Sequence, residues 1–390
     1  MPKVKQLRDE VIYEVVDRFF SEAEPGKKRK VKDIADEIGT AKGVPLTRED
    51  IYPILTEARE RGFLKVCPPT EIALAQRITD YYRLPEPADD LGQMPVQVVD
   101  VRGPGAIRAV AIRTAEVAVG IVRELFKQRG KEEVHIGLAS GFTALRIAQH
   151  LAELLRHEPE LPKLFFHSLS GGYSATNPEK ASVSFFSMFH SLPTEVEFVA
   201  LFAPPFVPTA DYQKLVERMP PVSDAFERRH EIDIVITALA SRMDQHGELN
   251  QFFKAMPDKD PDTGMLLRPR DQIIADVEAM GWAGDVQYRP FSHSGPIDLG
   301  AAGVPWTLMT LFGLTELAEL AAREDKAVIL AGAPCVQCQR KRADAVDALL
   351  QNEKLRVSSH TVVDSVTAVK LVTGDLMDPM DEQYLEATGT

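Results

Sequence analysis

The stretch that decides the fold is Val134-His-Ile-Gly-Leu-Ala-Ser-Gly-Phe-Thr143. It predicts an apolar strand over Glu133–Leu138, a turn of small residues, and a helix over Ala144–Leu155. The backbone N–H groups of such a turn lie at the positive end of the helix dipole. There they form an anion site, which the Ser140 and Thr143 hydroxyls can complete. The alternative is a tight turn that needs glycine only for its geometry, because the stretch has neither a Walker A loop nor a GxGxxG fingerprint.

Strands and helices alternate along the chain around this stretch. Short aliphatic runs predict strands, and several of the intervals between them carry helical spacing. This order favours an α/β fold with a mostly parallel, doubly wound sheet that helices cover on both faces. The predicted strands are Val96–Val101, Leu164–Leu169, Val196–Phe202, Ile232–Ala238 and Ala327–Ala331, and the predicted helices are Ala106–Arg129, Thr209–Met219 and Leu311–Ala322.

A second loop of small polar residues, Leu169–Pro178, also follows a predicted strand. In a parallel sheet this loop and the Ser140 turn fall at the same edge, outside the carboxyl ends of the strands. Ligands of open α/β sheets bind at that edge. The two loops together therefore indicate a binding site, although either alone would be an ordinary turn.

The N-terminal residues predict a separate small unit. Three amphipathic helices and a trailing extended segment are typical of a winged helix-turn-helix, and a generic helical cap or dimerisation domain is the alternative. Asp50 lies three residues after Thr47, which is the spacing of a capping box. The predicted helices are Lys5–Glu22, Val31–Ile38 closed by Gly39, and Thr47 to about Arg61, and the extended segment is Gly62–Val66.

The length of the chain and the distribution of its charge also indicate separate domains. A chain of 390 residues is longer than one hydrophobic core fills, so two or three domains are expected. Residues 1–66 hold 14 Lys and Arg against 13 Asp and Glu, whereas the other 324 residues have a net charge of −14. We expect a winged helix-turn-helix head at 1–66, a helix (Ile72–Tyr82) and linker at 67–95, an α/β domain at 96–372, and a disordered tail at 373–390.

The composition favours a cytoplasmic protein. With 44% hydrophobic and 26% charged residues, wholesale disorder, a collagen repeat and a coiled-coil rod are excluded. The N-terminus lacks the apolar region of a signal peptide, and the run Val304–Leu314 is shorter than the ~20 residues that cross a bilayer. Three cysteines do not make a disulfide framework, so a reduced compartment is expected.

Cys335-Val-Gln-Cys338 is the one motif with metal or redox character. The two cysteines are weak candidates for metal ligands, because zinc needs four ligands and Cys67 lies far away in sequence. A redox pair is a further possibility, and an incidental pair is the favoured interpretation. No cofactor is expected.

The order of segments from about Val31 to Val372 resembles the SorC/DeoR-like sugar-binding transcriptional regulators. Two head segments, Ile34–Gly39 and Leu55–Phe63, look like that family's head helices. The remaining matches lie in the α/β domain, in chain order: His135–Thr143, Leu169–Gly172, Phe202–Phe206, Ala283–Asp285 with Ser294-Gly295, and Ala331-Gly332 with Arg342–Val346 and Val363–Ala368.

The resemblance implies a DNA-binding head and an effector domain of the isomerase/deaminase-like fold that binds a phosphorylated sugar, in at least a homodimer. On this basis the phosphate would be held by the turn, with a second loop on the same edge. Asp285 would orient a hydroxyl, and one of three basic residues would close the site. The implied effector residues are Ser140, Gly141, Phe142, Thr143, Gly171, Gly172, Asn177, Asp285, Arg340, Lys341 and Arg342, and the implied DNA-binding residues are Lys28, Arg29, Lys30, Thr47, Arg48, Tyr52 and Arg59.

Two segments depart from the family pattern. The closing loop, Ala331-Gly-Ala-Pro-Cys-Val-Gln-Cys338, lacks the family's Gly-Gly pair and is longer. In place of the Lys that soon follows that pair it offers Arg340, Lys341 or Arg342, so a changed anion partner or a changed ligand is expected. In the recognition helix, the acids Glu49 and Asp50 would repel phosphates, and Pro53 would kink the helix or delay its start. Residues Thr40–Pro45 would lengthen the turn that precedes this helix.

Two other functions remain open at this stage. One is a sugar-phosphate isomerase or deaminase-like enzyme, for which Asp233, Asp244, Glu248 and Asp285 are the available acids and no cluster among them is diagnostic. The other is a sugar-phosphate sensor that no longer binds DNA.

Overall fold

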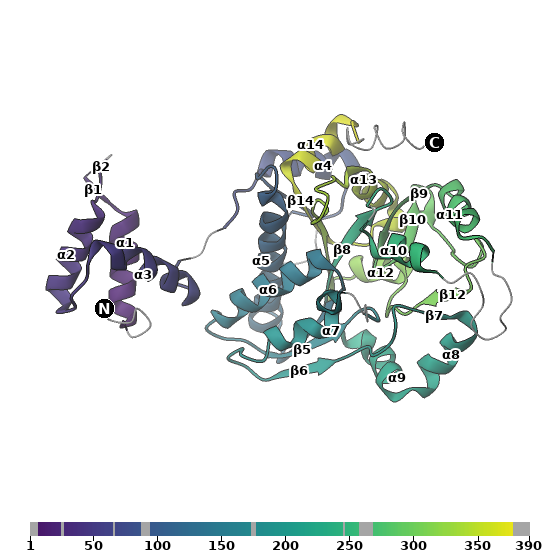
Figure 1. Ribbon diagram of the computed structural model, residues 1–390, viewed down its shortest axis with the longest axis horizontal. Helices are drawn as coiled ribbons and strands as arrows, with labels where there is room; N and C mark the ends of the chain where they lie inside the picture. The colour runs from purple at the N-terminus through teal and green to yellow at the C-terminus, as the bar shows by residue number, and fades with distance from the viewer. Residues whose placement is uncertain are drawn as a thin grey trace. The chain divides into compact units, whose positions relative to one another are not determined.

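The computed structural model divides the chain into two compact units, the head unit (Met1–Cys67) and the larger unit (Pro68–Thr390) (Figure 1). The structure describes residues 7–24, 27–64, 67–86, 94–172, 177–244, 246–256 and 268–376. Most of the predicted disordered tail, residues 377–390, therefore lies outside the described residues. The last helix before it, α14 (Ser365–Thr373), ends at Gly374 in the left-handed conformation.

The head unit contains the three predicted helices, α1 (Asp9–Phe20), α2 (Val31–Lys42) and α3 (Arg48–Glu60). Aliphatic side chains from all three helices meet in one buried cluster, which includes Ile12, Ile34 and Ile54. A short antiparallel hairpin of β1 (Glu22–Glu24) and β2 (Lys27–Lys28) lies between α1 and α2. Of the predicted trailing segment, Gly62–Leu64 form a turn, and residues 65–66 lie outside the described part.

Helix α2 is longer than the sequence predicts. It runs through Gly39 to Lys42 and ends at Gly43, whose φ is 64°. A Cβ atom on Gly39 would lie 3.0 Å from the Val44 carbonyl oxygen, so this glycine permits the close return of the chain and does not end the helix. The connection to α3 is therefore shorter than Thr40–Pro45 suggested.

Helix α3 begins where Thr47 predicted. The Thr47 side chain and the Asp50 carboxylate form the expected capping box. Pro53 lies inside the helix, so the expectation that this proline delays the start is wrong.

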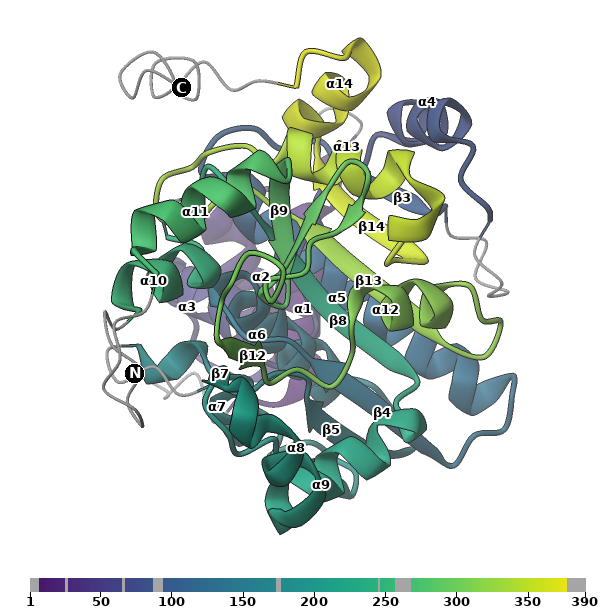
Figure 2. The same cartoon turned by 90° about the vertical axis from the view of Figure 1, so that its right-hand side faces the viewer.

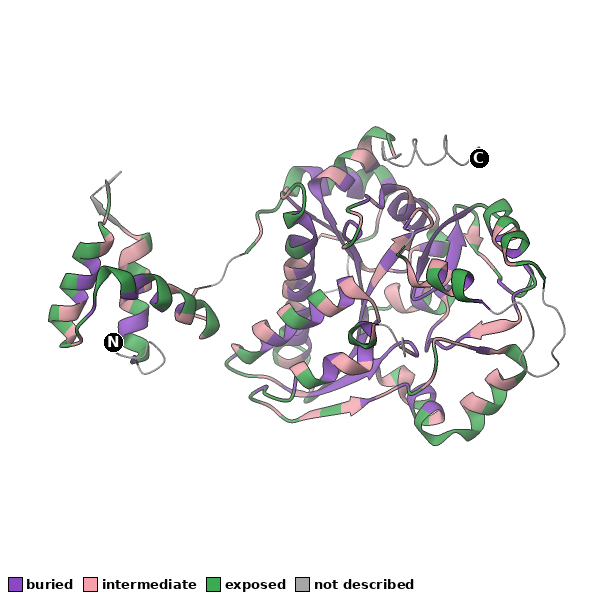
Figure 3. Ribbon diagram, viewed as in Figure 1, coloured by how far each residue is buried: buried purple, intermediate pink, exposed green. Residues whose placement is uncertain are grey.

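The larger unit is built on a mostly parallel sheet, as predicted. Seven parallel strands lie in the order β6-β5-β4-β8-β13-β14-β3. Their bounds are β3 (Val96–Val99), β4 (Glu133–Leu138), β5 (Lys163–Ser168), β6 (Val196–Val199), β8 (Ile234–Ser241), β13 (Ala327–Gly332) and β14 (His360–Asp364). Most of their residues are buried (Figure 3).

Helices cover both faces of the sheet, and each face has its own apolar cluster. Ile234 and Ile236 of β8 face the cluster of α5 and α6, whereas Val235 and Leu239 face the opposite cluster, which contains residues of α4, α9, α12, α13 and α14. This alternation is the pleat of a strand that is buried on both sides. The helices are α4 (Ile72–Tyr82), α5 (Gly105–Lys127), α6 (Phe142–Arg156), α7 (Ser182–Phe185), α8 (Thr209–Arg218), α9 (Pro220–Glu227), α10 (Glu248–Ala255), α11 (Arg270–Ala279), α12 (Leu314–Ala321) and α13 (Ala343–Gln351), with α14 above.

Strand β8 has two different partners along one edge. Strand β13 occupies the other edge, from Ile234 to Ala238. On the shared edge, Ile234–Ile236 pair with β4 in parallel, and Leu239–Ser241 then pair with the antiparallel strand β9 (Trp282–Val286). In Figure 2, β9 lies beside one end of β8 and β4 beside the other. The sheet therefore forks after Leu138, where β4 ends and β9 takes its place.

The antiparallel strands of the larger unit were not expected from the sequence. Strand β9 continues into β10 (Arg289–Ser292) and β11 (Gly295–Pro296), and a separate pair joins β7 (Phe206–Pro208) to β12 (Trp306–Leu308). These strands are two to five residues long and lack a clear period, which is why the pattern did not reveal them.

We predict that Tyr82→Phe destabilises the larger unit by roughly 1–3 kcal/mol, the range for hydrogen bonds to charged groups. The buried Tyr82 hydroxyl donates to Asp347 Oδ1 at 2.5 Å and thereby ties α4 to α13. Urea unfolding of the full chain measures this loss. The neighbouring Tyr81 is 61% exposed, so Tyr81→Phe is the matched control and should change little. Equal midpoints for both variants would contradict the assigned bond.

Candidate functional site

A pocket lies at the fork of the sheet, beside the carboxyl ends of β4 and β8. Four loops and one lysine converge there. The pocket is lined by the β4–α6 turn (Ala139–Ala144), the end of β8 and the loop after it (Ala238–Ala240, His246–Glu248), the β9–β10 turn (Asp285, Gln287, Tyr288), the closing loop (Cys335–Gln337, Arg342) and Lys180. This is the edge at which open α/β sheets bind ligands.

The predicted anion turn forms one wall of this pocket. Helix α6 begins at Phe142, and among the described residues no side chain caps its N-terminus. The N–H groups of its first turn have no acceptors within the helix, so they are available to an anion. Gly141 has a φ of 115°, which favours glycine, and its N–H donates to the Lys180 carbonyl at 2.8 Å. All four predicted turn residues, Ser140–Thr143, line the pocket.

The described residues of the second predicted loop support the first loop and do not line the pocket. Ser140 Oγ lies 2.9 Å from Ser170 Oγ and accepts from the Ser182 N–H at 3.2 Å. A Cβ atom on Gly171 would lie 2.6 Å from the Pro204 carbonyl oxygen, so only glycine fits there. Gly172 packs beside Ser140, and Asn177 precedes the short 3-10 helix Pro178–Lys180; neither is a lining residue.

Of the three predicted basic residues, only Arg342 lines the pocket. It is buried, and its Nε donates to Asp244 Oδ2 at 2.7 Å. Arg340 donates to the Met243 carbonyl at 2.6 Å, and Lys341 Nζ lies 3.5 Å from Asp364 Oδ1. The side chains of the three basic residues therefore point to different partners, and Arg342 is the one that reaches the pocket.

Three of the four acids considered for catalysis gather at this pocket. Asp285 and Glu248 line it, and Asp244 lies behind Arg342. Burial, together with the nearby charge of Asp244, raises the pKa of Asp285 to about 8, while Arg342 opposes the shift. Asp285 is therefore mostly protonated at neutral pH and can donate a hydrogen bond without repelling an anion.

Lys180, Gln287 and Tyr288 are among the lining residues that were not anticipated from the sequence. Lys180 Nζ lies 2.9 Å from Glu248 Oε1 and 4.4 Å from the centre of the Phe142 ring. Gln287 and Tyr288 form the two-residue turn between β9 and β10, with φ values of 52° and 66°. Such a turn usually contains Asn-Gly, so this sequence gave no signal for it.

Gln287 combines backbone strain with an unused side chain. Its amide nitrogen and oxygen are buried, and neither has a hydrogen-bond partner among the described residues. A buried amide with both groups unpaired is costly, and strained backbone concentrates at binding sites. Because Gln287 lines the pocket, it can serve a ligand that has both donors and acceptors.

A wider cavity lies at the opposite edge of the sheet, near the amino ends of β8, β13 and β14. Several of its charged groups are paired with each other: Arg129 Nε donates to Glu124 Oε1 at 2.9 Å, and Lys326 Nζ to Asp233 Oδ1 at 3.1 Å. Asp233, the fourth acid, therefore lies away from the other three. The pocket at the fork is the stronger candidate, because helix α6 and Gln287 present unpaired groups there.

The predicted DNA-binding residues of the head differ in availability. Arg29 pairs with Glu37 at 3.1 Å, and Thr47 caps α3. Asp50 is buried, and its carboxylate accepts from the Thr47 N–H at 2.8 Å, so its charge serves the cap. Glu49 remains exposed at the helix start. Besides Thr47, the exposed candidates are Lys28, Lys30, Arg48, Tyr52 and Arg59.

Several solved structures share this fold. The full-length sorbitol operon regulator SorC from Klebsiella pneumoniae matches with a TM-score of 0.54 at 14% identity, over 94% of this chain and 99% of that one. A DeoR family transcriptional regulator from Listeria monocytogenes (TM-score 0.53, 15% identity) and a probable sor operon regulator from Shigella flexneri (0.52, 14%) each cover 77% of this chain and 98% of their own.

These likenesses confirm the predicted resemblance to the SorC/DeoR regulators at the level of the fold. No family model and no curated protein matches the sequence. Within the described residues, no helix is long and apolar enough to cross a membrane.

We predict that Asp285→Asn flattens the pH dependence of stability. In the wild type, the folded state keeps the Asp285 proton up to a pKa of about 8, whereas the unfolded state loses it near 3.8. Between these values the free energy of unfolding falls as pH rises, by at most about 1.4 kcal/mol per pH unit. Urea midpoints between pH 5 and 9 test this.

The control for this experiment is Asp298→Asn, because Asp298 is exposed. It should keep the slope of the wild type. If Asp285→Asn also keeps that slope, Asp285 is not the group that holds the proton.

Proposed function

We propose that this chain is a cytoplasmic transcriptional regulator that binds a small phosphorylated sugar in the pocket at the fork and DNA through its head. The observation that carries the proposal is the uncapped N-terminus of α6 beside Gly141, which offers free N–H groups to a phosphate. Two of the structures with this fold are a sorbitol operon regulator and a probable sor operon regulator, which supports a sugar-type effector.

The other lining groups have complementary roles in this proposal. Lys180 and Arg342 supply positive charge near the phosphate, and the Arg342 guanidinium can bind it in bidentate fashion. Protonated Asp285 donates to a sugar oxygen, and the Gln287 amide both donates and accepts. Gly172 packs the second loop beside Ser140, and Gly171 packs it against the Pro204 carbonyl. Neither glycine would contact the effector, and nor would Asn177.

The head would contact DNA through its exposed basic side chains. Lys28, Lys30, Arg48 and Arg59 would meet phosphates, with Tyr52 at the same helix. Because Asp50 is turned into its cap, Glu49 is the acid that would oppose this contact. Effector binding would act in a homo-oligomer, by favouring one of two arrangements of its subunits.

An enzyme is the second candidate, and one observation favours it. Asp285 has a pKa near neutrality and shares the pocket with Glu248, as a general acid–base pair would. Incubation with pentose and hexosamine phosphates tests this: turnover that Asp285→Asn abolishes would make the chain an isomerase or deaminase. Binding without turnover supports the regulator.

We predict that Lys180→Met weakens sugar-phosphate binding by about 10- to 100-fold, the cost of losing one charge-assisted hydrogen bond. Isothermal titration of the full chain with a panel of pentose and hexose phosphates measures the affinity. Lys341→Met is the control, because Lys341 faces Asp364 and not the pocket. Equal losses in the two variants would mean that the phosphate does not lie beside Lys180.

We predict that Arg48→Ala weakens DNA binding at all sequences and makes the salt dependence of binding shallower by about one unit of log–log slope. Fluorescence anisotropy on duplex from the gene's own upstream region, at several salt concentrations, measures both. Arg77→Ala, an exposed change on α4, is the control. If the wild type binds this duplex no better than a scrambled one, the chain is a sensor without a DNA role.

A further inference from the structure

A group of potential metal ligands that the proposed function does not use lies where the closing loop meets the loop after β8. Asp244 follows β8, and Cys335 and Cys338 follow β13. One carboxylate oxygen and the two sulfur atoms all lie within 4.8 Å of one another. All three cysteines of the chain are free thiols, and Cys67 is exposed in the head unit.

Asp244 has one carboxylate oxygen without a partner. The residue is fully buried. Its Oδ2 accepts from the Ser241 N–H at 3.1 Å and from Arg342 Nε at 2.7 Å, whereas Oδ1 has no hydrogen-bond partner among the described residues. A buried charged oxygen left unpaired costs considerable free energy, so its presence points to a missing ligand.

The geometry requires little rearrangement to hold a tetrahedral ion. Zinc–sulfur bonds of about 2.3 Å place two sulfurs roughly 3.8 Å apart around a tetrahedral centre. The Cys335–Cys338 loop is already closed, because the Cys335 N–H donates to the Arg340 carbonyl and the Gln339 N–H to the Cys335 carbonyl, both at 2.9 Å. Ser241 and Arg342 orient the carboxylate from behind, as outer partners of metal ligands do.

We propose that Asp244, Cys335 and Cys338 bind a zinc-class divalent cation, with its fourth position open to the pocket at the fork. Two thiolates select a soft ion such as zinc over magnesium or calcium. Two thiolates and one carboxylate bring three negative charges, which the ion and Arg342 balance. Cys335 and Arg342 both line the pocket, so the ion would form part of its wall.

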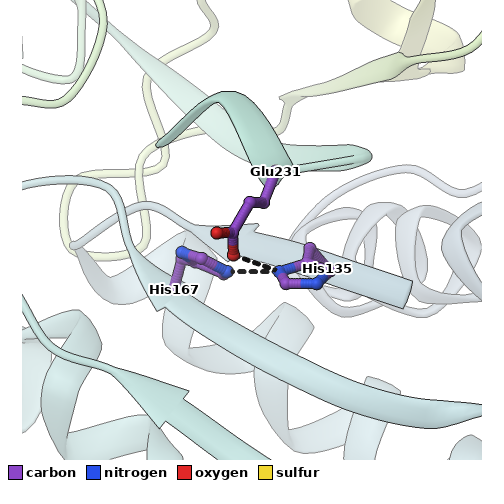
Figure 4. A group of neighbouring side chains, drawn as sticks. All are labelled: His135, His167 and Glu231. Carbon is purple, nitrogen blue, oxygen red and sulfur yellow. Dashed lines mark hydrogen bonds and ion pairs between the residues drawn. The ribbon is translucent and has the colours of Figure 1, made fainter. Parts of the chain in front are cut away.

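A second group of potential metal ligands differs from this one, because its ligand atoms already have partners within the protein (Figure 4). His135, His167 and Glu231 also lie within 4.8 Å of one another. There, however, His135 Nδ1 and His167 Nε2 already share a hydrogen bond of 2.9 Å, and Glu231 Oε2 accepts from Arg228 Nε at 2.9 Å. Its facing atoms have partners, whereas Asp244 Oδ1 has none in the part of the chain that the structure describes.

The bound ion would also raise the affinity of the pocket for its effector, an expectation that rests on the proposed function. A cation with an open position in the pocket wall can accept an oxygen of the sugar or its phosphate. The affinity of the zinc-loaded chain for a sugar phosphate should then exceed that of the metal-free chain by at least tenfold. The metal site itself does not depend on this coupling.

The test uses the full chain, kept reduced with a non-thiol reductant and stripped of metal with a chelator. Zn²⁺ is then titrated in competition with a chelator of known affinity. We expect tight binding of one Zn²⁺ per chain. Cys335→Ser, Cys338→Ser and Asp244→Asn should each weaken it by more than the ~100-fold that loss of an outer partner costs. Cys67→Ser is the matched control and should bind like the wild type.

Cobalt provides a readout that needs no variant. Co²⁺ bound to the wild type should give intense visible bands and a thiolate-to-metal charge-transfer band, which report tetrahedral thiolate coordination. Failure of the reduced wild type to bind Zn²⁺, weak octahedral bands, or unchanged affinity in the Cys335 and Cys338 variants would each overturn the site. Sugar-phosphate titration of the metal-free chain separately tests the proposed function, so the two failures are distinguishable.

Discussion

The structure of the site depends on the limited hydrogen-bonding capacity of β8. A strand has two edges, and β13 fills one of them. On the other edge β4 pairs with the first half of β8 and β9 with the second, so the two partners part after Leu138. The fork leaves the turn after β4 uncovered and places the N-terminus of α6 in the opening. The predicted anion turn, Asp285 of β9 and the closing loop meet there for this one reason.

Charge balance then decides what the pocket can accept. Asp244, Glu248 and Asp285 stand against Arg342 and Lys180, and two of the acids pair with those cations at 2.7 and 2.9 Å. Burial keeps Asp285 mostly protonated at neutral pH. The free N–H groups of α6 therefore face no uncompensated negative charge. A phosphate could bind there only under this condition, because it is itself negatively charged. The fold alone would allow an enzyme or a sensor. In an enzyme Asp285 would transfer a proton to or from the ligand, whereas in a sensor it would only donate a hydrogen bond.

The sequence alone was sufficient to predict helices and strands with a clear local signal, such as regularly spaced apolar residues or a capping box. Strand Glu133–Leu138, helix Ile72–Tyr82 and the start of α3 at Thr47 all appear where the pattern predicts them. Elements fixed by distant contacts were not predictable: Gly39 is set by the returning chain at Val44, and β9–β10 turns through Gln287 and Tyr288 without the usual residues. The side-chain directions of Arg340, Lys341 and Arg342 were not predictable, because their partners lie about a hundred residues away in sequence or belong to another strand. Lys180 reaches the pocket only because its loop crosses the α6 turn, which no local pattern reports.

Hydrogen exchange of the full chain, with and without saturating sugar phosphates from the panel, tests the central claim most directly. The account predicts that a bound sugar phosphate slows exchange at residues 139–145 and 285–288, at the fork, and leaves the cavity at the opposite edge unchanged. Slowed exchange confined to residues 121–129 and 321–327, at that opposite cavity, would contradict the claim that the fork makes the binding site.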